Sequence, residues 1–284
     1  MQDVVENTGM PGPIGAPPAG GRTPRVREAL LLVLASLLLT VSLGLYLQLR
    51  DLLTGIVWTE ILCLLVPVAA AMRIGRYAFR STLAMRWPGW GALGMAVLAG
   101  PAAALLAGQV FWLQSLLWSP PAWYLEMMET LAAEARSGNL LLGILAVSVL
   151  PALGEETLFR GFVMTGFRAR WGPVASVGAS AFLFALVHVD PFRFVAVGLL
   201  GVFLGYLVRA SGSLLPALVV HAVNNALALL PPSLAEVRGL GWISGNRSAP
   251  ALWVAGSAAV LLLVIVWFQR SGGTQSIRTT GGRT

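Results

Sequence analysis

Seven polar side chains in hydrophobic segments are the part of this sequence that could do chemistry. They are Glu155, Glu156, Arg160, His188, His221, Asn224 and Asn225. The chain has only two histidines, and both lie in apolar stretches, as does its one pair of adjacent acidic residues. Placing an ionisable group in hydrocarbon costs roughly 2.5–3.5 kcal/mol even on lenient insertion scales. Such residues usually face one another or a wet cavity, so all seven are candidates for function.

Helical spacing places several of these residues on common faces. Glu156 and Arg160 are four residues apart, so they can form an ion pair on one face. Glu155 points about 100° away from Glu156, which leaves it available for another role. His221 and Asn225 have the same spacing as the ion pair and also share a face.

This set of residues suits hydrolysis. A buried carboxylate can take a proton from water, an imidazole can hold that water, and a His or Asn donor can stabilise an oxyanion. Asn224 lies beside Asn225 and could substitute for it. A purely structural role is the alternative, because buried ion pairs and interhelical hydrogen bonds also hold membrane helices together. The sequence has no His-Glu-x-x-His zinc helix, and no serine or cysteine is obviously paired with a base.

The composition indicates a polytopic membrane protein. Of the 284 residues 57% are hydrophobic and 11% are charged, too few charges for a soluble domain of this length. Because lipid cannot satisfy the backbone of an open sheet, we expect an all-α transmembrane bundle. About eight spans can be drawn, at roughly 29–49, 54–72, 90–117, 140–168, 174–189, 194–208, 213–231 and 251–268. Residues 119–137 have the pattern of an interfacial amphipathic helix.

The spans also set the expected depths of the candidates. At 1.5 Å per residue, Glu155 lies roughly 18 Å and His188 roughly 21 Å from the same side of the membrane. His221 lies at roughly 12 Å, so a helix tilt must make up the difference. The sequence therefore predicts that the three side chains converge from three helices.

The placement of arginine predicts the orientation. All 19 basic residues are arginine; thirteen lie on one side of the predicted spans, five lie on the other, and Arg160 lies within the membrane. The excess of positive charge on cytoplasmic loops places both termini in the cytoplasm, and we expect a bacterial plasma membrane. The net charge of +7 does not indicate a nucleic-acid partner, because the arginines lie in short loops without stacking aromatic residues.

Three parts are expected along the chain. Residues 1–28 are a Gly/Pro-rich tail that we expect to be disordered, 29–268 form the membrane bundle, and 269–284 form a second disordered tail. Cys63 is expected to be a small buried hydrophobic residue. No internal repeat is evident, so the inverted symmetry common in transporters is not indicated.

Three motifs resemble those of the CAAX-processing and bacteriocin-processing (CPBP) family of intramembrane proteases, which includes the eukaryotic prenyl-protein endopeptidase. That family has Glu-Glu-x-x-x-Arg, Phe-x-x-x-His and His-x-x-x-Asn/Asp, in this order, on an eight-span bundle. The corresponding residues here are Glu155-Glu156 with Arg160, Phe184 with His188, and His221 with Asn225. The resemblance covers about residues 140–230, which would be the protease core.

The resemblance implies an intramembrane endopeptidase that hydrolyses a peptide bond of a membrane-associated or prenylated protein. Glu155 would be the general base and His188 would help to hold the water. His221 and Asn225 would stabilise the oxyanion. The catalytic set would be Glu155, Glu156, His188, His221 and Asn225, supported by Arg160, Phe184 and Asn224.

Several alternatives stay open at this stage. The resemblance favours a metal-free mechanism that needs no cofactor, but Glu155, His188 and His221 could bind zinc. A bacteriocin-immunity or scaffolding membrane protein without catalysis, and an ion- or proton-coupled transporter, are the competing functions. The sequence does not specify the substrate, the side from which it enters, or the oligomeric state.

Overall fold

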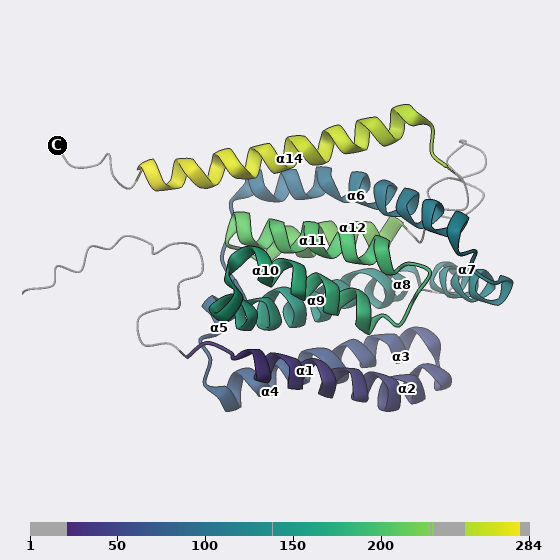
Figure 1. Cartoon of the computed structure of the whole chain (residues 1–284). Coiled ribbons are helices and arrows are strands. Elements are labelled where there is room, and N and C mark those ends of the chain that lie inside the picture. Colours follow the sequence, from purple (N-terminus) through teal and green to yellow (C-terminus); the bar gives the residue numbers. More distant parts are fainter. Residues whose placement is uncertain (1–21, 138, 228, 230–247, 279–284) are drawn as a thin grey trace, which may run out of the picture.

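The chain folds as an all-helical bundle, as the sequence predicted (Figure 1). The structure is a computed structural model that describes residues 22–137, 139–227, 229 and 248–278, and of 272–278 the backbone alone. Within these ranges six helices are long and apolar enough to cross a membrane. The tails that we expected to be disordered lie partly outside the described residues, at 1–21 and 279–284. Residues 230–247 also lie outside them.

The first two spans form an antiparallel pair. Their helical segments are α1 (Val26–Leu39), η1 (Thr40–Gly44), α2 (Leu45–Arg50), α3 (Leu52–Thr59), η2 (Glu60–Leu65) and α4 (Val66–Gly75), where η denotes a π-helical stretch. Helix α1 begins at Val26, three residues ahead of the expected start, because the Glu28 carboxylate accepts the backbone N–H of Arg25 at 2.7 Å. Asp51 caps α3 by accepting the N–H of Thr54 at 2.9 Å.

The next part consists of α5 (Phe79–Thr82), α6 (Trp90–Leu117) and α7 (Ala122–Ser137). A row of buried alanines on α6 packs against α11 and α12, and Gly100 contacts Val223 of α12. Small residues of this kind let membrane helices approach closely. Helix α7 occupies the segment that we expected to be amphipathic.

The longest helical segment contains two of the predicted spans. It comprises α8 (Leu140–Ile144), η3 (Leu145–Val149), α9 (Leu150–Glu156), η4 (Thr157–Val163) and α10 (Met164–Val187). The direction changes inside α10 at Gly172, where φ is 77° and ψ is 177°, and Pro173 follows. Glycine adopts this backbone conformation without a side-chain clash, so the two predicted spans are the two arms on either side of Gly172.

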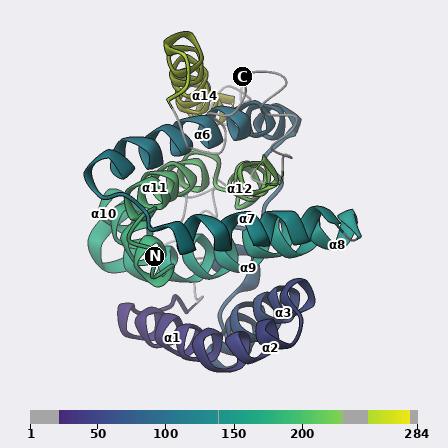
Figure 2. The ribbon, with the colours of Figure 1, turned by 90° about the vertical axis from the view of Figure 1, so that its right-hand side faces the viewer.

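The remaining helices are α11 (Phe194–Ser211), α12 (Leu215–Leu227) and α14 (Ala251–Arg278). Helix α12 has 13 residues, shorter than a full span, and α14 extends ten residues beyond the expected end at 268. Helices α11 and α12 lie in the middle of the bundle, between α6 and the segment α8–α10 (Figures 1 and 2). Helix α1 contacts α10, and α14 packs on α6 at the opposite side (Figure 2).

Candidate active site

Glu155 lies between the two imidazole rings. Its Oε2 atom is 3.6 Å from Nε2 of His221 and 3.9 Å from Nε2 of His188. The three residues come from α9, from α12 and from the C-terminal end of α10. The side chain of Glu155 is 17% exposed and that of His221 is 4% exposed, so the carboxylate lies at the rim of a buried cluster.

Each imidazole is oriented by a bond from its other nitrogen. Nδ1 of His188 is 2.6 Å from the carbonyl oxygen of Phe184, and Nδ1 of His221 is 2.9 Å from Oε1 of Glu156. Both partners are acceptors, so we assign the proton of each neutral ring to Nδ1. The unprotonated Nε2 atoms then both face the Glu155 carboxylate.

Glu156 and Arg160 form a buried ion pair beneath this cluster. Nη1 of Arg160 donates to Oε1 of Glu156 at 2.8 Å, and neither side chain is exposed to solvent. Nη2 of the same guanidinium donates to the carbonyl oxygen of Gly201 on α11 at 3.1 Å. One oxygen of Glu156 therefore accepts from both Arg160 and His221, which links α9, η4, α11 and α12.

Phe184 is the apolar partner of this network. Its ring lies 4.1 Å below the guanidinium carbon of Arg160 and makes edge contacts with both imidazoles. A cation over an aromatic face is attracted by the ring quadrupole, by about 2 kcal/mol when the pair is desolvated. The same residue also orients His188 through its carbonyl oxygen, so Phe184 positions groups from two of the three motifs.

Irregular helical turns flank the two glutamates. The stretch η3 ends six residues before Glu155, and η4 begins directly after Glu156. π-helical turns are frequent at functional sites because they change the angular register of the side chains that follow. The hydroxyl of Ser148 in η3 donates to the carbonyl oxygen of Ala222 at 2.7 Å, which ties this helix to α12 next to His221.

The two asparagines are adjacent to the cluster along α12. Nδ2 of Asn224 donates to Oδ1 of Asn225 at 3.1 Å, so the NH₂ group of Asn225 remains as a donor. Asn225 follows His221 by one helical turn and is half-buried. Among the described residues no direct hydrogen bond joins Asn225 to Glu155 or to either imidazole.

The sequence analysis missed Glu60, a third glutamate beside the site. It lies in η2 and is buried, and a Cβ on Gly154 would collide with its Oε2 atom. Its charge interacts with that of Glu155, and its Oε2 has no hydrogen-bond partner among the described residues. The available signal was an acidic residue within the predicted span 54–72, the same signal that identified the other candidates.

A zinc site does not fit the arrangement of these side chains. Among the described residues no group of three or more His, Cys, Asp or Glu side chains has a geometry that could hold a metal ion. Zinc requires three or four N, S or O ligands that meet at about 2.0–2.3 Å from one point. The proposed set of Glu155, His188 and His221 is therefore not supported as a zinc site.

One comparison with known proteins, that with protein families, gave a match, and it covers the segment that contains this site. Residues 137–227 match the Rce1-like family model, described as type II CAAX prenyl endopeptidase Rce1-like. No curated protein and no solved structure gave a significant match. The matched segment includes all three motifs, from Glu155 to Asn225, and the Rce1-like family is part of the CPBP family that these motifs resemble.

Proposed function

We propose that this membrane protein is an intramembrane endopeptidase in which Glu155 activates the attacking water. The observation that supports this most strongly is the position of the Glu155 carboxylate between two imidazole Nε2 atoms, at 3.6 and 3.9 Å. Both rings are fixed through Nδ1, so their free nitrogens are aimed at one place. The Rce1-like match agrees with protease activity at the level of the family.

The hydrogen-bonding capacity of these atoms suits one bridging water. Oε2 of Glu155 and Nε2 of neutral His188 are both acceptors, and 3.9 Å is too long for a direct hydrogen bond. A water molecule has two O–H donors and can satisfy both acceptors at once. Glu155 takes one proton as the water oxygen attacks the scissile carbonyl carbon, and the same proton then passes to the leaving amine as the C–N bond breaks.

His221 and Asn225 are proposed to stabilise the negative oxygen that forms in this step. Glu156 holds Nδ1 of His221, and Nε2 would act as the donor in the form of the ring that carries a proton on both nitrogens. The NH₂ group of Asn225, one turn further along α12, is the second donor. Arg160 acts through Glu156 and is therefore a positioning residue.

Glu60 is proposed to share a proton with Glu155. The charge of buried Glu60 interacts with that of Glu155, and like charges repel strongly in a low-dielectric site. A proton held on Glu60 would leave Glu155 charged and able to act as base. Gly154 makes the arrangement feasible, since a larger residue there would displace the Glu60 carboxylate.

The substrate is proposed to be a membrane-associated protein or peptide. A site at this depth, among helices that cross the bilayer, is reached by a chain held at the membrane. A prenylated C-terminal segment is the substrate class that the family description suggests. The proposed orientation, with both termini in the cytoplasm, places the arginine-rich loops on the cytoplasmic side.

The test is cleavage of a membrane-anchored peptide by the purified full-length chain in detergent. Glu155→Gln is expected to lower turnover by roughly 10²–10⁴-fold, the usual contribution of a general base. Glu126→Gln, on the exposed side of α7, is the matched control and should keep wild-type activity. If Glu155→Gln folds and still cleaves, Glu155 is not the general base. If the folded wild-type chain cleaves no membrane-anchored peptide, a non-catalytic immunity or scaffolding role becomes the better account.

A further inference from the structure

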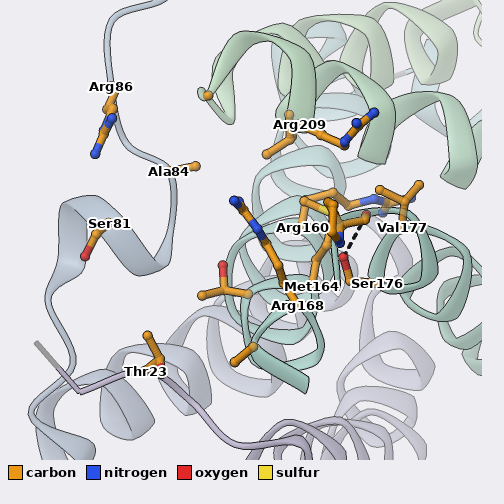
Figure 3. A pocket seen from close by; sticks show the side chains of 15 residues that line it. Thr23, Ser81, Ala84, Arg86, Arg160, Met164, Arg168, Ser176, Val177 and Arg209 are labelled. Carbon is orange, nitrogen blue, oxygen red and sulfur yellow. Dashed lines mark hydrogen bonds between the residues drawn. The ribbon is translucent and has the colours of Figure 1, made fainter. Parts of the chain in front are cut away.

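A cavity lies at the arginine-rich end of the bundle. Its volume is about 190 Å³. Figure 3 shows its lining, which comes from segments that are distant in sequence: Thr23 before α1, Ser81 and Arg86 around α5, Arg168 in α10 and Arg209 in α11. Four loops of the predicted cytoplasmic side thus meet around one space.

The charge of the lining is entirely positive. Four arginines line the cavity, namely Arg86, Arg160, Arg168 and Arg209, and no Asp or Glu is among the described residues that line it. In Figure 3 Arg168 lies between Arg86 and Arg209. Arg168 and Arg209 are near enough for their like charges to interact. Glu156 already offsets the charge of Arg160, so the guanidinium groups of Arg86, Arg168 and Arg209 give the cavity its positive character.

Arg160 adds a buried donor to the same cavity. Its side chain has no solvent exposure, and its Nε–H has no hydrogen-bond partner among the described residues, although both Nη atoms are bonded. A buried N–H of a charged group that lacks a partner destabilises the folded protein. An acceptor on a ligand in the cavity would remove that cost.

Two hydroxyl groups of the lining already donate to backbone carbonyls. The hydroxyls of Thr165 and Ser176 donate to the backbone carbonyls of Thr82 and Pro173 at 2.9 and 3.0 Å. Their hydrogens are therefore engaged, and the arginines are the donors that face the cavity. Planar guanidinium groups match the oxygens of a phosphate group in two-point contacts, which is why arginine is common at such sites.

We propose that this cavity is a binding site for a phosphate group, supplied either by an anionic phospholipid headgroup or by a soluble phosphate. The site lies at the level where the loops leave the membrane, which is where headgroup phosphates are found. It shares Arg160 with the network around Glu156, but phosphate binding there does not depend on hydrolysis.

The test compares two double variants of the full-length chain that lose the same charge. Arg168→Gln with Arg209→Gln removes two arginines of the cavity, and Arg73→Gln with Arg80→Gln removes two exposed arginines of nearby loops that do not line it. Size-exclusion chromatography and thermal unfolding first establish that both variants fold. Binding is then measured in two arms.

In the lipid arm, phosphatidylcholine nanodiscs containing phosphatidylglycerol are used, and retained lipid is counted by native mass spectrometry. In the soluble arm, inorganic phosphate is titrated in neutral detergent and its stabilisation of the protein is followed by thermal unfolding. The cavity variant is expected to bind at least about tenfold more weakly than both wild type and the control variant, since each arginine–phosphate contact contributes more than a neutral hydrogen bond. A loss in one arm alone identifies the source of the phosphate. Equal behaviour of the two double variants in both arms would overturn the proposal.

Discussion

Nε2 of His221 lies 3.6 Å from Oε2 of Glu155. The opposite nitrogen of the same ring is bonded to Glu156, so this imidazole lies between two adjacent glutamates that have different surroundings. Glu156 is fully buried and paired with Arg160, whereas Glu155 is partly exposed and has no guanidinium contact. Two neighbouring carboxyl groups can therefore take separate roles, one holding the ring and the other acting on water.

The contribution of Glu156 to turnover can be separated from its contribution to stability. Glu156→Leu should destabilise the protein by about 3–5 kcal/mol, because it leaves the buried charge of Arg160 without its carboxylate partner. The double variant Glu156→Leu with Arg160→Met removes both charges and should recover most of that stability. Its turnover should still be at least about 10²-fold below wild type, since His221 has lost its acceptor. Thermal unfolding and peptide cleavage measure the two effects, and a stable double variant with full activity would contradict the role of Glu156.

Asn225 is expected to contribute through its amide N–H. Asn225→Ala should lower kcat by roughly 10²–10³-fold with little change in KM, as the loss of an oxyanion donor does. Asn224→Ala is the comparison, and its effect should be smaller because Asn224 only orients its neighbour. Steady-state kinetics on a membrane-anchored peptide distinguish the two. Equal and small effects would remove Asn225 from the oxyanion site.

Glu60→Gln tests whether the third glutamate takes part in proton transfer. The variant keeps the shape of the side chain and removes its acidic proton, so kcat should fall by roughly 10²-fold if Glu60 helps to keep Glu155 charged. The pH–rate profile should also change shape, which a purely structural role would not cause. A variant with lower thermal stability but an unaltered pH–rate profile would assign Glu60 to packing alone.

The loop after His188 is tied to α7 by a charged contact that is sensitive to pH. Oδ2 of Asp190 accepts the Tyr124 hydroxyl and Nε of Arg193, both at 2.7 Å. Burial would raise the pKa of Asp190, but the hydrogen bonds from Tyr124 and Arg193 outweigh it and lower the pKa below its usual value. Because the folded pKa is the lower one, the contact contributes fully to stability above the unfolded value of about 4, and this contribution is lost as the pH falls from there through the lower folded pKa.

Tyr124→Phe should therefore lower stability by about 1–2 kcal/mol at neutral pH, as expected for the loss of a hydrogen bond to a charged group. The difference from wild type should shrink as the pH falls below about 4 towards the lowered pKa of folded Asp190, where the carboxylate becomes protonated. Thermal unfolding in detergent across this pH range measures both effects. Phe79, an exposed aromatic residue outside this contact, provides a control as Phe79→Ala, whose effect should not change with pH.

The helical bundle and much of the site were predictable from the sequence because local spacing determines them. Uninterrupted apolar runs predicted helices, and the i,i+4 spacing of Glu156 and Arg160 predicted an ion pair that the structure shows at 2.8 Å. We expected His221 to lie at a shallower depth than Glu155, but the structure places Nε2 of His221 3.6 Å from Oε2 of Glu155. Their approach depends on how α12 packs against α9, which no local pattern encodes.

Other features required three-dimensional information. Glu60 and Gly154 are 94 residues apart in sequence, so their contact has no motif. The π-helical turns beside Glu155 and Glu156 follow from tertiary packing, because their residues have no distinctive helix propensity. The change of direction at Gly172 was anticipated only as a break between 168 and 174, since a Gly-Pro pair ends a helix without fixing the angle of the next one.

Arg160 joins Glu156, the backbone of α11 and the ring of Phe184 in one side chain. Any replacement at position 160 consequently alters three contacts together, and lost function there could not be attributed to a single one of them. Substitutions at Phe184 and Glu156 each leave two of those contacts in place. Genetic surveys of this protein would thus learn more from the partners of this residue than from the residue itself.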